Sequence, residues 1–371
     1  MAKQTAIPCM LMRGGTSKGP FFYAKDLPTD IAARDAVLLA AVGSPDKRQI
    51  DGLGGAHSLT SKVGIVDVYA GEEADLSFLF AQLQPEKDTV DTTPNCGNML
   101  AAVVPFALEK GLIAAQGDTT TVKVLTLNTG MVAEICVQTP NGEVEYEGEA
   151  RIDGAPGSSA PIKINFLDTA GSVAGALLPT GNVVDVFHID GIGDLQATCI
   201  DNGMPMVLVR AADVGRTAYE SVADLNQDAD LKAKIEQLRL QAAVKMGLGD
   251  VTNKNYPKMC LLGSPVNGGA IHTRCYIPHV CHDAIGVLAA VTVATACVLP
   301  GSVADGLAVA GQVDGHSSLM SIEHPSGEFS VELTTAADDA TNVLSAALLR
   351  TARLIMRGEV MVPSHLGTQA S

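Results

Sequence analysis

The sequence predicts an α+β fold of two similar strand-rich domains, each a mixed β-sheet or barrel wrapped around one central buried helix. Short runs of β-forming residues recur along the chain, separated by Gly, Asn and Pro. Two segments, 96–108 and 281–299, are apolar on nearly all sides, as buried helices are. Both begin with a cysteine, and their spacing of 185 positions is half of the 371-residue chain.

This half-chain spacing predicts a duplicated architecture. The join falls near 181–194, a Gly-rich stretch with loop character, so the predicted domains are 1–185 and 186–371. A single core stops growing near ~250–300 residues, which also favours two domains. The apolar content of 47% is sufficient for two cores.

The individual elements follow from hydrophobic periodicity. Apolar and β-branched runs predict first-half strands over 5–12, 62–69, 120–128, 132–138 and 144–152, with PNGE at 140–143 as a hairpin turn. Second-half strands are predicted over 197–200, 206–209, 259–262, 269–277 and 329–333. Amphipathic patterns predict helices over 31–42 and 231–246, and a closing helix is predicted over 341–357.

The charge distribution limits the class of partner. A net charge of −16 argues against a nucleic-acid partner, which a basic stripe normally binds. Residues 1–62 hold eight Lys/Arg and five Asp/Glu, a net of +3, so the other 309 residues carry −19. The cations therefore concentrate in one segment, and a small polycarboxylate is compatible with the chain.

The apolar runs and the cysteines predict a cytoplasmic protein without a membrane partner. The longest apolar run, 284–299, has sixteen residues and two threonines, whereas a membrane span needs ~20 residues. The start of the chain has no long apolar signal-peptide region. The eight cysteines are scattered, so we expect reduced thiols. The composition permits a homodimer but does not require one.

Three Gly-rich polar loops cluster in the first hundred residues, at 12–19, 50–62 and 91–98. Backbone N–H groups of such loops can form anion-binding concavities, although ordinary turns are the alternative. The first loop lacks the Gly-Lys-Ser/Thr of a phosphate-binding loop. The second has no preceding strand and no following amphipathic helix, so it is not a dinucleotide fingerprint.

Cys96 and Lys62 are the strongest candidates for catalytic residues. Cys96 starts a predicted helix, where free N–H groups favour a thiolate, and the alternative is an inert core cysteine. Lys62 lies between a polar loop and an apolar strand, where burial favours the neutral amine, a usable base. A lysine whose ammonium reaches solvent is the alternative there.

The segment HTRCYIPHVCH raises a zinc hypothesis. Its spacing matches no standard Cys or His pattern, so we predict no metal site. Cys281 and His282 instead open the second buried helix and mirror Cys96. The possible ligands in this segment are His272, Cys275, His279, Cys281 and His282, and His324 is a weaker functional candidate.

An ordered set of motifs carries a family resemblance. In chain order they are MRGGTSKG, DGLGGAHSLTSKV, PNCGNML, DNGMP, MGLGDV, IPHVCH and EHPSGEF. Together they resemble the PrpF-type isomerases, which share the diaminopimelate epimerase-like fold. The likeness runs from residue 7 to about residue 362. The set is more specific for the family than for the substrate.

The resemblance implies proton transfer at carbon without cofactor or metal, in a cleft between the two domains. Lys62 in LTSK and Cys96 in NCGN would be the acid/base pair. In the epimerases of this fold, the second helix opens with Cys-Gly-Thr/Ser. Here Cys281 precedes a histidine, which favours a one-face allylic or tautomeric shift over two-thiol racemisation. The resemblance implies a substrate-binding set of Arg13, Gly15, Thr16, Ser17, Lys18, Ser61, Asn95, Gly97, Asn98, Asn202, Met204, His279, Cys281 and His282.

The expected activity is isomerisation of an unsaturated oxo-tricarboxylate. Keto–enol tautomerisation of 4-oxalomesaconate, in gallate and protocatechuate breakdown, is the main expectation. The alternatives within the family are cis–trans isomerisation of 2-methylaconitate and a 1,3-allylic shift of oxalomesaconate. An amino-acid racemase is disfavoured because the loops offer cations and amides rather than carboxylates for an ammonium group. An alternative of another class is a non-catalytic polycarboxylate-binding accessory protein.

Overall fold

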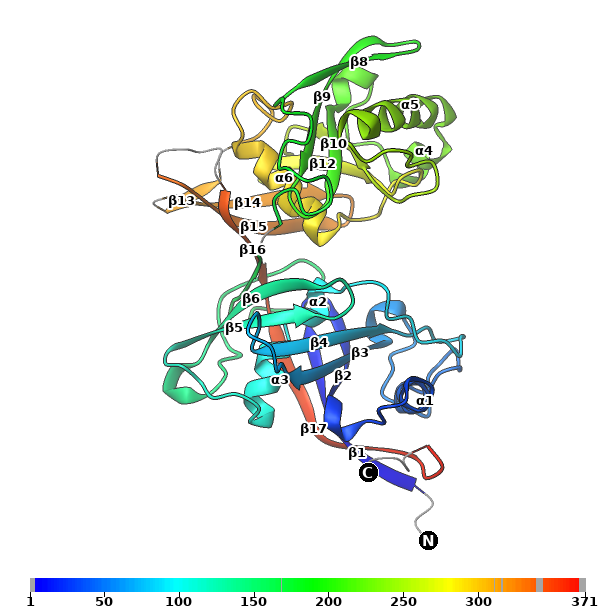
Figure 1. Ribbon diagram of the computed structural model, residues 1–371, viewed down its shortest axis with the longest axis vertical. Helices are drawn as coiled ribbons and strands as arrows, with labels where there is room; N and C mark the ends of the chain where they lie inside the picture. Colours follow the sequence, from blue (N-terminus) through cyan, green and yellow to red (C-terminus); the bar gives the residue numbers. More distant parts are fainter. Residues whose placement is uncertain (1–3, 168, 310, 315, 338–342, 367–371) are drawn as a thin grey trace. The chain divides into compact units, whose positions relative to one another are not determined.

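The computed structural model describes residues 4–167, 169–309, 311–314, 316–337 and 343–366. The chain divides into two compact units, Met1–Leu167 with Leu349–Ser371 and Asp168–Leu348. These bounds differ from the predicted 1–185 and 186–371, because the C-terminal strand pairs with the N-terminal strand of the first unit. In Figure 1 the red C-terminal strand β17 runs beside the blue β1. The cleft between domains stays a prediction.

The first unit is built on one mixed sheet, in the order β17-β1-β2-β3-β4-β5-β6-β7. The pairs β2–β3 and β4–β5 are parallel and the others antiparallel. The strands are β1 Gln4–Gly14, β2 Ser17–Tyr23, β3 Lys62–Val68, β4 Leu76–Gln82, β5 Thr119–Thr126, β6 Met131–Gln138, β7 Ile162–Phe166 and β17 Ala352–Pro363.

This sheet curves around a broken central helix. Helix α3 (Val103–Lys110) contacts β17 at one end of the strand order, β3 in its middle and β6 near its other end. The helix α2 (Gly97–Leu100) contacts β1, β2 and β3. Pro105 explains the break between α2 and α3, because it has no N–H to donate and its ring would clash with the carbonyl of Ala101.

Helix α1 (Ile31–Val42) covers the other face of the sheet. Its N-cap Asp30 accepts a hydrogen bond from the N–H of Ala33, and Gly43 ends the helix in the left-handed conformation at φ 88°. Val37 and Leu38 pack with strand residues in an outer core. The sheet is therefore covered on both faces, by α3 inside its curve and by α1 outside.

The second unit has a sheet in the order β8-β9-β10-β11-β12-β14-β15-β16, with β13 also paired to β14. The pairs β10–β11 and β12–β14 are parallel. The strands are β8 Asp185–Ile189, β9 Gly193–Asp201, β10 Pro205–Arg210, β11 Lys258–Gly263, β12 Ile271–Tyr276, β13 Gln312–Asp314, β14 Ser317–His324, β15 Gly327–Thr335 and β16 Val343–Arg350.

The central helix of this unit is α6 (Val287–Val298), which contacts β9, β10, β14 and β15. Its middle turns are buried on all sides, as the apolar sequence predicts. Helices α4 (Val222–Gln227) and α5 (Ala229–Lys245) form an outer layer, packed on β8 and β11. Within the described residues, no helix combines the length and the hydropathy that crossing a membrane requires.

The two units repeat one topology. From β1 to β7 the successive pairings are antiparallel, parallel, antiparallel, parallel, antiparallel, antiparallel. The series β9, β10, β11, β12, β14, β15, β16 repeats this order. In each unit the central helix follows the fourth strand of the series, and the outer helix follows the second. The predicted fold class is confirmed.

Three local predictions are wrong. The closing helix over 341–357 is replaced, from residue 343 on, by β16 and β17, while 341 and 342 lie outside the described residues. Sheet pairing overrides the helical propensity of the Ala and Leu residues there. Residues 144–152 form no strand, although Ala150 makes an isolated bridge with Ser159. The predicted loop near 181–194 contains β8.

Candidate active site

Lys62 opens β3 with its side chain on the inner face of the sheet, and it is only 8% exposed. Its neighbour Val63 belongs to the outer core, which fixes the opposite direction for Lys62. The amine Nζ donates to Gln82 Oε1 at 2.7 Å and lies 4.9 Å from the centre of the Phe80 ring. Gln82 is the direct cross-strand partner of Lys62. An uncharged amide and an aromatic face thus hold the amine in place.

Cys96 lies within reach of this amine. The distance from Lys62 Nζ to Cys96 Sγ is 3.8 Å. Cys96 is the N-cap of α2 and is partly exposed, and its N–H donates to the Asn95 side chain at 2.8 Å. The first N–H groups of a helix have no acceptor within it, so Gly97 and Asn98 present backbone donors beside the thiol. An amine, a thiol and N–H donors therefore gather at one point.

The turn between β1 and β2 packs directly on α2. Gly15 has φ 53°, and a Cβ added to it would lie 2.2 Å from Asn98 Oδ1. Asn98 Nδ2 in turn donates to Thr16 Oγ1 at 3.0 Å. Glycine is required here both by the left-handed backbone and by the close approach of the helix. The predicted residues Gly15, Thr16 and Asn98 are thus brought together beside Cys96.

Ser17 carries a buried polar atom without a partner. Its side chain is 1% exposed, and among the described residues its Oγ has no hydrogen-bond partner. Leaving such a group unsatisfied costs about 1–3 kcal/mol, so buried hydroxyls normally have an acceptor or donor nearby. Ser17 pairs with Gly14, whose added Cβ would touch the backbone of Asn98. Its hydroxyl therefore lies on the α2 side of the sheet.

Ser61 supports this site through the backbone next to Lys62. It is fully buried, and its hydroxyl bonds to Gln49 Oε1 at 2.9 Å and to the His57 carbonyl at 2.8 Å. These bonds tie Ser61, the residue before Lys62, to Gln49 and to His57. Ser61 therefore positions the lysine backbone.

Arg13 and Lys18 lie on the opposite face of the hairpin. They are register partners on β1 and β2. Their strand neighbours Gly14 and Ser17 lie on the α2 side, so alternation along each strand turns Arg13 and Lys18 to the other side. Arg13 donates to the carbonyl of Gly15 at 2.9 Å and to Thr351 Oγ1 at 2.9 Å. Burial and the nearby Arg353 lower the pKa of Arg13. Arg13 holds the hairpin turn, and the structure does not bring either cation to Lys62.

Asn202 and Met204 lie in the second unit, in the turn between β9 and β10. Asn202 is buried, with Oδ1 accepting from Thr169 at 2.5 Å and Nδ2 donating to Thr295 at 2.9 Å. Both polar ends of its side chain thus bind protein groups. The carbonyl of Met204 accepts from Thr292 at 3.2 Å. These contacts secure the turn on α6.

Cys281 does not open the second central helix, as predicted, because α6 begins at Val287 with Gly286 as its N-cap. In both units an isolated bridge residue lies six positions before the helix start, Asp91 before α2 and Cys281 before α6. Cys281 therefore corresponds to Asp91, and Gly286 corresponds to Cys96. The Cys281 side chain lies in the hydrophobic core between the second sheet and helices α4 and α5. Burial there raises the pKa of its thiol to about 11.

The two predicted histidines near Cys281 have local partners. His279 lies 3.4 Å from Glu236 of α5, with half of its side chain exposed. His282 is exposed, and its Nδ1 accepts from the N–H of Ala284 at 2.8 Å. Both belong to the second unit.

His272 and its neighbours form a structural cluster. Arg274 can only donate, so its 2.5 Å bond makes His272 Nε2 an acceptor, and Nδ1 then donates to Glu323 at 2.9 Å. Glu323 also accepts from the N–H groups of Val266, Asn267 and Gly269. Across the described ranges, no three His, Cys, Asp or Glu side chains gather in a way that could hold a metal ion.

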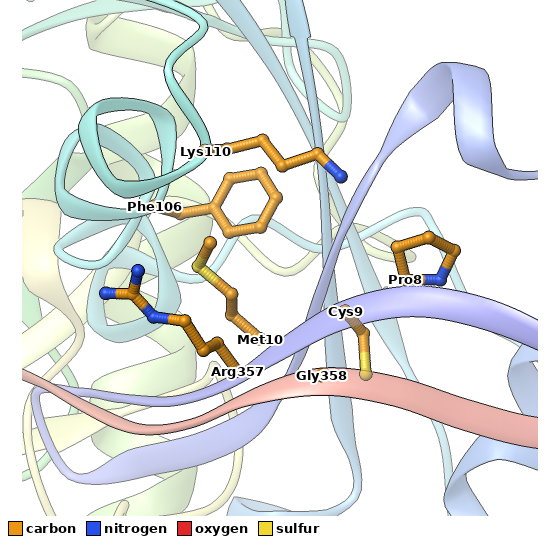
Figure 2. Close-up of a pocket in the computed structure, with 7 residues that line it drawn as sticks. All are labelled: Pro8, Cys9, Met10, Phe106, Lys110, Arg357 and Gly358. Carbon is orange, nitrogen blue, oxygen red and sulfur yellow. The ribbon is translucent and has the colours of Figure 1, made fainter.

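A separate hollow of about 240 Å³ lies in the first unit (Figure 2). Its two cations are already paired, Lys110 with Asp26 at 2.9 Å and Arg357 with Glu109 at 2.5 Å. Its lining includes none of the predicted site residues, and it is mainly apolar. The lining residues are Pro8, Cys9, Met10, Phe106, Lys110, Arg357 and Gly358.

Gln82, Phe80 and Gln49 are site-supporting residues that sequence reasoning missed. Gln82 and Phe80 alternate on β4, a strand that was not predicted although LSFLFAQ has the apolar character of one. An amide and a ring carry no chemical signature of their own. Only the pairing of β3 with β4 indicates that they face Lys62.

Comparison with known proteins places this duplicated α+β fold among the isomerases. The chain superposes on the crystal structure of methylitaconate-delta-isomerase with a TM-score of 0.86, covering 99% of this chain and 98% of that one at 34% identity. The model of the PrpF protein family matches residues 4–363. The chain therefore belongs to the PrpF family, and it is an isomerase.

Two curated relatives are similar over nearly their whole length. The chain is 55% identical to the (4E)-oxalomesaconate Delta-isomerase of Novosphingobium sp. (strain KA1), covering 96% of this chain and 97% of that protein. It is 51% identical to the 4-oxalomesaconate tautomerase of Pseudomonas putida (strain KT2440), covering 97% of both. Both names contain the word oxalomesaconate, and one describes a Delta-isomerase whereas the other describes a tautomerase.

Proposed function

We propose that this protein isomerises 4-oxalomesaconate, by keto–enol tautomerisation, in the breakdown of gallate and protocatechuate in the cytoplasm. The single observation that carries the proposal is the amine of Lys62 held 3.8 Å from the thiol of Cys96. A base and an acid at this distance can act on neighbouring atoms of one substrate. The names of the two curated relatives support the substrate.

The reaction needs a base for a C–H bond. We infer that the amine of Lys62 takes a proton from a carbon next to the carbonyl group, where the resulting negative charge spreads onto oxygen. Gln82 Oε1 accepts one N–H of the amine and holds Nζ in position. A positioned base typically contributes ~10²–10⁴-fold to the rate.

The negative charge that develops on oxygen needs donors. The N–H groups at the start of α2 and the unpartnered hydroxyl of Ser17 are the groups proposed to supply them. Cys96 then gives its proton to the substrate, and the proton on Lys62 passes to the thiolate. Both groups return to their starting states. The substrate has lost a proton at one atom and gained one at another. The reverse assignment, with Cys96 as base, remains the alternative because the two groups are coupled.

A 1,3-allylic shift of oxalomesaconate is the second candidate. It is favoured by the relative with 55% identity, which is named as a Delta-isomerase. The same pair would serve it, with Cys96 returning the proton to a carbon instead of to oxygen. Isomerisation of 2-methylaconitate is a weaker family alternative, and a binding protein without turnover is the alternative of another class.

The test is the fate of protons in D₂O. Purified protein is incubated with 4-oxalomesaconate and followed by proton NMR and ultraviolet absorbance, with 2-methylaconitate and citrate as comparison polycarboxylates. Enzyme-dependent keto–enol conversion supports tautomerisation, and a shifted C=C with deuterium at its new saturated carbon supports the allylic reaction. The absence of turnover of every oxo-tricarboxylate would overturn the proposed function.

A further inference from the structure

One amide side chain continues the first sheet where β5 stops. In Figure 1 β4 lies between β5 and β3. The β4–β5 pairing ends at Phe78 and Thr126, whereas β4 runs on to Gln82. Beyond that end, Asn128 Oδ1 accepts from the N–H of Phe80 at 2.9 Å, and Asn128 Nδ2 donates to the carbonyl of Phe80 at 2.8 Å. The Asn128 side chain therefore binds both backbone groups of Phe80, as a neighbouring strand would.

The same side chain also holds the segment that leads to Cys96. Asn128 Nδ2 donates a second hydrogen bond, to the carbonyl of Thr92 at 2.7 Å. The adjacent residue Asp91 pairs with Gln82 through two backbone hydrogen bonds, of 2.8 and 2.9 Å. Cys96 follows Thr92 by four positions. Asn128 thus joins the strand that supports the amine of the candidate site to the segment that carries its thiol.

The turn between β5 and β6 holds Asn128 in place. The N–H of Gly130 donates to the carbonyl of Thr126 at 2.8 Å, and the hydroxyls of Thr126 and Thr129 are 2.9 Å apart. The N–H of Leu127 donates to a β4 carbonyl at 2.8 Å. The backbone before Asn128 is therefore bound to β4, and the turn is closed by its own hydrogen bonds.

The β4 residues in these contacts support Lys62. The Phe80 ring lies 4.9 Å from Lys62 Nζ, and Gln82 Oε1 accepts from that amine at 2.7 Å. A shift of β4 would move both supports, and a shift of the segment before Cys96 would move its sulfur, which is 3.8 Å from the amine. Asparagine suits position 128 because it offers an acceptor to one N–H and two donors to two carbonyls.

We propose that Asn128 is a positioning residue, which fixes the spacing between the amine of Lys62 and the thiol of Cys96. This inference rests on the proposed function, because it concerns the pair to which the proton transfer is assigned. Asn128 acts through the backbone of Phe80 and of Thr92, and all five residues belong to the first unit.

The test compares Asn128→Asp with Asp75→Ala, which serves as the matched control. Asn128→Asp keeps the size of the side chain but replaces both donors with an oxygen that faces two carbonyl oxygens. Asp75 Oδ2 accepts from the N–H of Lys123 at 2.9 Å, so it also supports the β4–β5 pairing, at the end away from Lys62.

The two variants should differ in kcat, although both should melt below the wild type because each loses hydrogen bonds. A misplacement of about 1 Å can cost ~100-fold in rate, so kcat of Asn128→Asp for 4-oxalomesaconate should fall by about 10- to 100-fold, with KM changed less. Asp75→Ala should keep the wild-type kcat. Asn128→Ala, which sets no oxygen against the carbonyls, replaces Asn128→Asp in the assay if the latter does not fold.

A double-variant cycle with Gln82→Leu separates positioning from a general loss of stability. If Asn128 and Gln82 both act by placing the same amine, their effects on kcat are not independent. The double variant should then lose at least about threefold less than the product of the two single losses. A purely structural role of Asn128 predicts the full product.

Three results would overturn the inference while the wild-type enzyme still turns over substrate. They are a kcat of the folded Asn128 variant within about threefold of the wild type, an equal loss of kcat in Asp75→Ala, and full independence in the cycle with Gln82→Leu. If the wild-type enzyme turns over no oxo-tricarboxylate, the proposed function fails first, and this inference fails with it.

Discussion

Gly19 supports the position of Lys62, and its replacement tests whether that position matters. A Cβ at residue 19 would lie 1.8 Å from the carbonyl oxygen of Lys62 and 2.7 Å from its carbonyl carbon. Real Cβ contacts are essentially never shorter than 3.0 Å, so β2 and the start of β3 must separate by about 1 Å or more. Gly19→Ala therefore shifts the backbone that carries the proposed base.

A displacement of about 1 Å in a reacting group can cost ~100-fold in rate, which corresponds to about 2.7 kcal/mol. We expect kcat/KM of Gly19→Ala for 4-oxalomesaconate to fall by about this factor, and overpacking to cost ~1–3 kcal/mol of unfolding free energy. Activity is measured well below the melting temperature, after circular dichroism has shown that the variant is folded.

Gly358→Ala in β17 is the matched control, because no atom lies within 4 Å of its added Cβ. It should keep the wild-type rate and stability. If folded Gly19→Ala also keeps kcat/KM within about threefold of the control, the contact does not set the position of Lys62 and the reasoning fails.

Three further predictions concern the amide of Gln82, the thiol of Cys281 and the pH dependence of stability. Gln82→Leu removes the acceptor that orients Lys62 Nζ, so kcat should fall about 10-fold in steady-state assays. Cys281, with its pKa raised to about 11 by burial, should stay unmodified by iodoacetamide near pH ~7.5 in mass spectra of the folded protein, and Cys281→Ser should keep most of the activity. The unfolding free energy should fall as the pH drops below 6.5, because burial lowers the pKa of His272 and only the unfolded chain accepts the proton readily. It should fall further below 4.5, because backbone N–H donors and His272 outweigh burial and lower the pKa of Glu323.

Each of these predictions has a contradicting result. Unchanged kcat in Gln82→Leu would remove the amide from the account of Lys62. Rapid alkylation of Cys281 in the folded state would show that the thiol is not buried as described. For the pH dependence, urea midpoints of the wild type and of His272→Gln are compared, and equal slopes below pH 6.5 would exclude His272 as the group responsible.

Hydrophobic periodicity predicted the elements whose structure is set by the burial of their own side chains. The apolar segment that becomes α6 and the amphipathic α1 were predictable because burial requires those side chains. The segment that forms β16 and β17 was predicted as a helix because Ala, Leu and Arg favour one. Its real structure depends on sheet pairing: β16 pairs with the preceding strand β15, and β17 pairs with β1, which lies far away in the sequence.

The candidate site was predictable where the residue type carries chemistry. Lys62 and Cys96 were singled out because an amine at a core edge and a thiol at a helix start are chemically conspicuous, and the structure places the two groups 3.8 Å apart. Cys281 was mistaken for the counterpart of Cys96 because a cysteine attracts notice, whereas the true counterpart is Gly286.

The central claim is that Lys62 and Cys96 move the proton, and deuterium incorporation from D₂O tests it most directly. Proton NMR follows 4-oxalomesaconate with the wild-type enzyme, Lys62→Met and Cys96→Ser, each shown to be folded by its melting curve. The wild type should incorporate deuterium at the reacting carbon, and each variant should slow isomerisation by at least ~10²-fold, with Lys62→Met also losing the exchange. Exchange and isomerisation at the wild-type rate in both folded variants would contradict the account.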